Sequence, residues 1–177
     1  MIISISGTPG TGKTSVAKIL AKKFDTNLIS IKELIKNHKI PFVLDKKRNT
    51  KIIDVKYIKR AVKKSLAKDK TNIIEGHISH FIPSKMKFVL ICDPLVLRKR
   101  LQKRGWNKKK INENVLAEIL QIIQSEAKNP YIINTTKLSA EKTTEQILKI
   151  IRNPKSYKHK DENWLKKYKK LALQMEN

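Results

Sequence analysis

The sequence predicts an α/β fold in which a parallel, doubly wound sheet is flanked by helices. Short apolar runs typical of buried strands lie at residues 2–6, 72–74, 88–92 and 131–133. Stretches with the apolar spacing of helices lie at residues 14–24, 54–68, 94–104, 111–127 and 139–152. Strands that alternate with helices in this way pair in parallel, because each helix carries the chain back across the sheet.

The turn after the first predicted strand carries the strongest functional signal. Residues 7–14 read GTPGTGKT and match the pattern GxxxxGK[ST] at every fixed position, between a strand and a helix. This predicts a P-loop NTPase whose loop binds Mg²⁺·ATP: Lys13 reaches the terminal phosphates, and the Thr14 hydroxyl ligates Mg²⁺. The predicted nucleotide-binding residues are Gly7, Gly10, Thr11, Gly12, Lys13 and Thr14.

Such a loop needs a carboxylate at the end of a neighbouring strand to orient the ligands of the metal. Asp93 ends one apolar run, but Pro94 follows it, so capping of a helix is the favoured interpretation. Glu75 ends another run and is followed by Gly76, which leaves room for a phosphate or a water molecule. We therefore expect Glu75 to serve the metal and His77 to lie nearby as a catalytic residue. The alternative for His77 is a hydrogen-bonded loop histidine.

The chain has only six arginines, and three fall in the stretch 97–106. Arg is favoured over Lys where bidentate recognition matters. Arg100 and Arg104 are four residues apart and share a helix face, so we expect them to clamp the transferring phosphoryl group. Gly105 would hinge a lid at about residues 102–112. A solvated basic helix face is the alternative.

Composition limits the class of protein. A chain of 177 residues suits one domain, and 40 Lys and Arg against 15 Asp and Glu give a formal net charge of +25. This charge attracts polyanions such as nucleotides or RNA, although Lys enrichment can also reflect codon usage or a hot habitat. The single cysteine, Cys92, excludes a disulfide framework. No apolar run reaches the length of a spanning helix, so we expect a cytoplasmic protein without a membrane partner.

A break in composition follows Asn153. We expect residues 1–153 to form the catalytic domain and residues 154–177 to form a basic amphipathic tail. Residues 154–160 read as a connector, and apolar residues recur at helical spacing from Trp164 to Met175. Packing on the parent domain is the favoured role of this helix, and docking on a partner or on RNA is the alternative.

Three segments together resemble the adenylate kinase family shared by archaea and eukaryotic nuclei, whose members are also ATPases of small-subunit ribosome assembly. The segments read GTPGTGKTS, IIEGHISH and RLQKRGWNKKKINENVLAEI, and the resemblance runs from about residue 1 to residue 152. It implies a nucleoside-monophosphate (NMP) kinase fold with small NMP-binding and lid segments. It also implies phosphate transfer between ATP and AMP, and Mg²⁺-dependent ATP hydrolysis linked to rRNA maturation.

The resemblance also assigns residues, and it adds Ser15 to the residues of the ATP-binding loop. Arg104 matches the lid arginine, and residues about 28–51 match the NMP-binding segment. Lys36 stands where many members carry an Arg, and Arg48 is a second candidate contact to the monophosphate. The family's Asp-x-His motif reads Glu75-Gly76-His77 here, so the carboxylate is one methylene longer.

Two functions remain open at this stage. The first is an NMP kinase of the adenylate kinase type. The second is mainly an ATP-hydrolysing assembly factor that binds a small-subunit ribosomal protein or rRNA, with His77 positioning the attacking water. A signalling GTPase is disfavoured, because the sequence has no Asn-Lys-x-Asp segment to read guanine.

Overall fold

A computed structural model describes residues 1–37, 40–46, 50–158 and 162–176. Within these residues, five parallel strands form the main sheet in the order β2-β5-β1-β6-β7. The strands are β1 (Ile2–Gly7), β2 (Asn27–Ser30), β5 (Asn72–Glu75), β6 (Met86–Ile91) and β7 (Tyr131–Asn134). The predicted α/β fold with a parallel sheet is confirmed.

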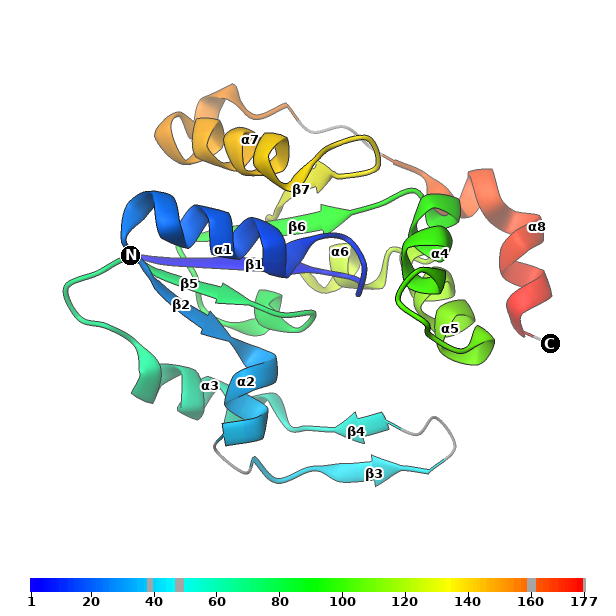
Figure 1. Cartoon of the computed structure of the whole chain (residues 1–177), viewed down its shortest axis with the longest axis horizontal. Coiled ribbons are helices and arrows are strands. Elements are labelled where there is room, and N and C mark those ends of the chain that lie inside the picture. The colour runs from blue at the N-terminus through cyan, green and yellow to red at the C-terminus, as the bar shows by residue number, and fades with distance from the viewer. Residues whose placement is uncertain (38–39, 47–49, 159–161, 177) are drawn as a thin grey trace.

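Helices cover both faces of this sheet (Figure 1). They are α1 (Lys13–Phe24), α2 (Ile31–Asn37), α3 (Val55–Ser65), α4 (Pro94–Gln102), α5 (Lys108–Ile119), α6 (Ile122–Glu126), α7 (Ala140–Arg152) and α8 (Trp164–Glu176). Two single 3₁₀ turns span Ser79–Phe81 and Pro154–Ser156. None of the described helices is both long and apolar enough to cross a membrane.

Alternation along the strands builds a core on each face. Ile3 and Ile5 of the central strand β1 pack with residues of α1 and α7 in one cluster. On the other face, Ile74 of β5 packs with Ile58 of α3 in a second cluster that also includes residues of α2. Burial on both faces explains why these strands read as continuous apolar runs rather than as alternating patterns.

Two parts of the fold differ from the sequence prediction. The single helix expected at residues 111–127 is two helices, because Gln121 takes a left-handed conformation with φ of 54° between α5 and α6. The Gln121 amide donates to the Glu162 carbonyl at 2.6 Å, which holds this break in place. Strand β2 and the hairpin of β3 (Val43–Asp45) and β4 (Thr50–Ile52) were not predicted as strands.

The basic tail helix α8 packs on the domain. Trp164 is only 4% exposed and shares a cluster with Val89, Ile91 and Ala127. Further along, Tyr168 and Ala172 join the cluster between α4 and α5. The apolar stripe of this helix therefore completes the core, and its lysines face outward.

Replacing Trp164 with Ala should lower the free energy of unfolding by about 3 to 5 kcal/mol, because it removes a buried ring and leaves a cavity. Leu165→Ala is the matched control, since Leu165 on the same turn is 47% exposed. Denaturant unfolding measures both variants. Equal, small losses would mean that α8 does not pack on the domain in solution.

Candidate active site

The loop between β1 and α1 lies at the carboxyl ends of the parallel strands, where ligands bind in open α/β sheets. Its backbone needs glycine at specific places. A Cβ on Gly7 would lie 2.2 Å from the Leu90 carbonyl oxygen of β6. Gly10 has φ of 98°, and a Cβ there would meet Leu97 of α4 at 2.7 Å. The loop is thus packed tightly against β6 and α4.

The amino terminus of α1 faces this loop. Its N-cap residue is Gly12, with φ of 97° and no side-chain hydrogen bond to the first turn of the helix. Backbone N–H groups at an uncapped helix start, together with the positive end of the helix dipole, form an anion site. The first helical turn of Lys13, Thr14 and Ser15 is therefore suited to bind phosphate oxygens.

The Lys13 ammonium is held within the loop. Its Nζ donates to the Thr8 carbonyl at 3.1 Å, and the residue is buried. Burial lowers the pKa of Lys13 to about 8, against the opposing effect of the carboxylates of Glu75 and Glu118, and Arg104 lowers it further. An incoming phosphate would provide a stronger partner than the carbonyl and would favour the charged amine.

Glu75 is buried at the end of β5, and two hydroxyl groups donate to its carboxylate. Thr14 Oγ1 donates at 3.0 Å, and Ser30 Oγ at the end of β2 donates at 2.7 Å. The two residues predicted to serve the metal are thus brought together. An oxygen-only set of a hydroxyl and a carboxylate next to a phosphate site suits Mg²⁺, which prefers hard oxygen ligands and retained waters.

Asp93 caps helix α4, which is the role that the sequence favoured for it over a role at the metal. One carboxylate oxygen accepts from the backbone N–H groups of Leu95 at 3.0 Å and Val96 at 3.4 Å, which caps α4. The other oxygen accepts from Lys167 at 3.0 Å and from the hydroxyl of Tyr168. Asp93 therefore links the start of α4 to α8.

His77 follows Glu75 by two residues and is exposed to solvent. Neighbouring protein atoms displace part of the water around the ring, and this loss of hydration lowers the pKa of His77 to about 4. The positive charge of Lys13 acts in the same direction. Since the lowered value and the ordinary one both lie below 7, the imidazole is neutral at neutral pH. A neutral imidazole can accept a proton or orient a water molecule.

The two candidate arginines have different surroundings. The Arg100 guanidinium donates to the Thr135 carbonyl at 2.9 Å, the Thr136 carbonyl at 3.3 Å and the Gly10 carbonyl at 3.4 Å. Arg100 thus ties the phosphate loop to the loop after β7, and its predicted role as a clamp on the phosphoryl group stays a prediction. Arg104 is exposed and close enough to Lys13 to act on its charge.

The predicted NMP-binding segment divides between the sheet and an excursion. Residues 28–30 belong to β2 in the main sheet, whereas α2 and the hairpin β3-β4 project from it (Figure 1). Lys36 is exposed on α2. Arg48 lies outside the described residues. Val43 and Ile52 on the hairpin are 69% and 56% exposed, so this excursion also presents apolar surface.

One further residue of this site, Glu118 of α5, was not predicted from the sequence. It is 4% exposed, accepts from the backbone N–H of Cys92 at 2.8 Å, and accepts a short hydrogen bond from the Thr8 hydroxyl. Burial raises the pKa of Glu118 to about 7, against the effect of these hydrogen bonds and of Lys13. Its position in helix α5, rather than at a strand end, concealed its contact with the phosphate loop.

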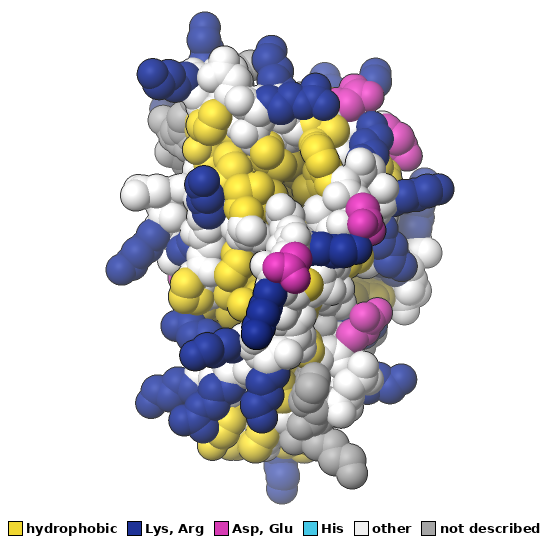
Figure 2. Space-filling model, turned by 90° about the vertical axis from the view of Figure 1, so that its left-hand side faces the viewer, with side chains coloured by type: hydrophobic (Ala, Val, Ile, Leu, Met, Phe, Trp, Pro, Cys, Tyr) yellow, Lys and Arg dark blue, Asp and Glu magenta, His cyan; other side chains and the backbone are white. Residues whose placement is uncertain are grey.

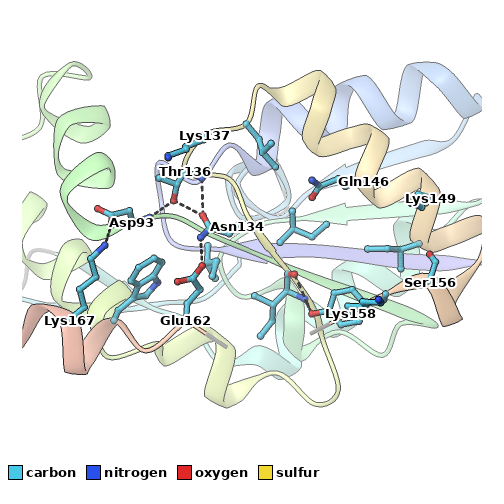
Figure 3. A pocket seen from close by; sticks show the side chains of 17 residues that line it. Asp93, Asn134, Thr136, Lys137, Gln146, Lys149, Ser156, Lys158, Glu162 and Lys167 are labelled. Carbon is cyan, nitrogen blue, oxygen red and sulfur yellow. Dashed lines mark hydrogen bonds and ion pairs between the residues drawn. The ribbon is translucent and has the colours of Figure 1, made fainter. Parts of the chain in front are cut away.

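A separate cavity of about 880 Å³ lies beside β7 between α7 and α8 (Figure 3). Around it, the Asn134 amide donates to Glu162 at 2.7 Å, and the Asp93 N–H donates to the Thr136 hydroxyl at 2.8 Å. On its other side, Thr135 donates to the Thr11 carbonyl of the phosphate loop at 3.0 Å. These contacts fix the loop after β7 against the candidate site.

Comparison with known proteins agrees with this geometry. A family model described as an AAA domain matches residues 3–121. A protein of Methanocaldococcus jannaschii named "Putative adenylate kinase" is 35% identical over 169 residues, which cover 95% of each chain. The protein of that name from Thermococcus onnurineus is 34% identical over 176 residues, which cover 97% of this chain and 96% of the relative. The chain belongs to this archaeal adenylate kinase family.

Solved structures show the same fold. A thymidylate kinase from Candida albicans superposes with a TM-score of 0.56 over 90% of this chain and 95% of its own, at 15% identity. Family membership identifies the chain as a phosphotransferase, and kinases of this kind use ATP, typically with Mg²⁺. The loop from Gly7 to Thr14 is the part of the chain whose geometry suits that chemistry.

Nucleotide affinity should fall as the pH rises from 8 to 9.5, because the Lys13 ammonium that binds phosphate deprotonates above its pKa of about 8. The steepest fall that one proton allows is about tenfold per pH unit. Calorimetric titration with Mg²⁺·ADP measures it. Lys13→Met should bind weakly and show no fall in this range, and a flat profile in the unaltered protein would contradict the role of Lys13.

Proposed function

We propose that this protein is an NMP kinase of the adenylate kinase type, which transfers a phosphoryl group reversibly between ATP and AMP. The observation that carries the proposal is the convergence of Lys13, Thr14 and Glu75 from α1 and β5 at the phosphate loop. Membership in the archaeal family supports the same reaction. The exposed excursion of α2 and β3-β4 offers the acceptor a second surface, outside the main sheet.

Each residue has a distinct task in this reaction. The N–H groups at the start of α1 hold the phosphates, and the Lys13 ammonium leaves the Thr8 carbonyl to bind the terminal phosphate oxygens. Thr14 and Glu75 would hold Mg²⁺, which neutralises phosphate charge when bound. Arg104 can approach the transferring group from the turn after α4. Positioning and charge neutralisation of this kind supply most of the rate of phosphoryl transfer.

The acceptor would bind at the excursion that leaves the sheet after β2. Lys36 on α2 supplies a point charge for the monophosphate, where an arginine would supply two parallel donors. The exposed apolar side chains of Val43 and Ile52 suit contact with a nucleoside. Arg48 is proposed as a second contact. Exclusion of water by a closing segment at about residues 102–112 would favour transfer over hydrolysis.

Incubation with Mg²⁺·ATP and AMP should give ADP from both nucleotides, at a rate far above that of Lys13→Ala. Chromatography resolves the products, and each other monophosphate is tested in parallel. Glu75→Gln should lower kcat by about 100-fold or more, because one metal-orienting carboxylate is removed while its hydrogen bonds can persist. Release of free phosphate at the same rate with and without any acceptor would contradict kinase activity.

A second function, favoured by the charge, is an ATP-hydrolysing assembly factor of the small ribosomal subunit that binds rRNA or a ribosomal protein. The net charge is +25, and Figure 2 shows Lys and Arg side chains spread over one whole face with few acidic ones between them. Such a field attracts RNA at long range. In this function His77 would orient the water that attacks the terminal phosphate.

Affinity for a small-subunit rRNA fragment should fall steeply with salt and should drop in the double variant Lys169→Ala/Lys170→Ala. Both lysines are exposed on α8, so the change removes charge without opening the core. Filter binding at several salt concentrations measures the salt slope, which should flatten by about one unit for each phosphate that the variant no longer neutralises. Affinity that ignores both salt and these lysines would exclude α8 as an RNA-binding surface.

A further inference from the structure

Glu118 is a buried carboxylate with two hydrogen-bond partners from different parts of the site. Its Oε1 atom accepts from the Cys92 N–H at the end of β6, and its Oε2 atom accepts from the Thr8 hydroxyl in the phosphate loop. The Thr8 carbonyl in turn accepts from Lys13 Nζ. One carboxylate thereby connects α5, the helix that begins within the proposed lid, to the loop that is proposed to bind phosphate.

We propose that Glu118 is a proton-linked positioning residue, which holds Thr8 of the phosphate loop from α5 and takes up a proton when nucleotide phosphates bind. This inference rests on the proposed function of the loop. Two changes favour the neutral acid on binding. Negative phosphate charge arrives next to the carboxylate, and Lys13 transfers its hydrogen bond from the loop to the phosphate.

Proton uptake would reverse one hydrogen bond without separating the two side chains. In the ionised state the Thr8 hydroxyl donates to Glu118. After one proton from the solvent joins Oε2, that oxygen donates to Thr8 Oγ1, and Oε1 still accepts from the Cys92 N–H. The Thr8 hydroxyl hydrogen is then released from the carboxylate and is free to turn to another acceptor. The position of Thr8 is kept while the negative charge beneath the phosphates disappears.

Among Glu118 and the titratable groups around it, Glu118 is the group whose pKa lies at neutral pH, so it is about half protonated there. Burial raises its pKa to about 7. Lys13, the charged group that acts on it from α1, is mostly protonated at pH 7 because its own pKa is about 8. The Cys92 thiol of β6 stays neutral, since burial raises its pKa to about 11 against the effect of Arg100.

Two other charged groups reach this network through Lys13. Glu75 raises and Arg104 lowers the pKa of Lys13. Neither acts directly on Glu118 among the interactions that shift its pKa. Glu118 and Lys13 do act on each other directly, so a change that neutralises Glu118 also lowers the pKa of Lys13. The same change leaves no direct effect to account for at Glu75 or Arg104.

Glu118→Gln provides that change. The amide copies the protonated acid, because its oxygen can accept from the Cys92 N–H and its N–H can donate to Thr8. Glu113→Gln is the matched control, since it removes the same charge from a partly exposed position of α5 that pairs with Lys110 at 3.0 Å. Thr8→Val is a second variant that removes the hydroxyl donor to the ionised carboxylate and keeps the side-chain shape.

Titration calorimetry with the non-hydrolysable analogue Mg²⁺·AMPPNP, repeated in buffers of different ionisation enthalpy, measures the protons taken up on binding. At pH 7 the Glu118 carboxylate should take up about half a proton in the unaltered protein, as expected for a group with a pKa of about 7. Glu118→Gln should lack this share and take up less, through Lys13 alone. Glu113→Gln should match the unaltered protein. Thr8→Val should shift the uptake to higher pH, because the ionised carboxylate loses a donor.

The pH dependence of affinity is a second readout. Affinity of the unaltered protein should fall severalfold from pH 6 to pH 7.5. Affinity of Glu118→Gln should fall less across that range, and only through Lys13, whose pKa drops when the carboxylate that raises it is removed. Equal proton uptake and parallel pH profiles in the two proteins, with binding intact, would overturn this inference and leave the proposed function standing. If both proteins bound the analogue as weakly as Lys13→Ala does, the proposed function and this inference would be overturned together.

Discussion

The close approach of the turn after β1 to its neighbours is the constraint on which the rest of the site depends. Gly7 lies so near the Leu90 carbonyl of β6 that a side chain cannot fit, and Gly10 packs on Leu97 of α4. Because β1 is the central strand of a parallel sheet, its end is surrounded by β5 and β6. The loop therefore has a fixed shape before any ligand arrives, and its amides need no reorganisation to face phosphate.

Burial of charge next to this loop is the second organising feature. Lys13, Glu75 and Glu118 are each less than a tenth exposed, and each has hydrogen-bond partners that offset part of the cost of burial. They come from α1, β5 and α5, so three elements far apart in the sequence fix one electrostatic site. Charges held in this way interact more strongly with phosphate than charges in water, and they respond to it by changing their affinity for protons.

The sequence was informative where chemistry requires particular residues at fixed spacing. The phosphate loop, the alternation of strands and helices, and the choice of Asp93 as a helix cap all followed from local patterns. The site residues that it missed depend on tertiary contacts. Glu118 reads as one more acid on an amphipathic helix, and Ser30 ends a strand too short to stand out. The spacing of Arg100 predicts a clamp, whereas its hydrogen bonds to carbonyls of the phosphate loop and of the loop after β7 could be found only from the structure.

Hydrogen exchange of the backbone amides, with and without Mg²⁺·ATP, tests most directly whether the loop from Gly7 to Thr14 is the nucleotide site. We predict strong added protection at the start of α1, because those N–H groups have no side-chain cap and would bind phosphate. Lys13→Met should lose most of that protection. Protection that appears elsewhere, or that is unchanged in the variant, would contradict the assignment of the site.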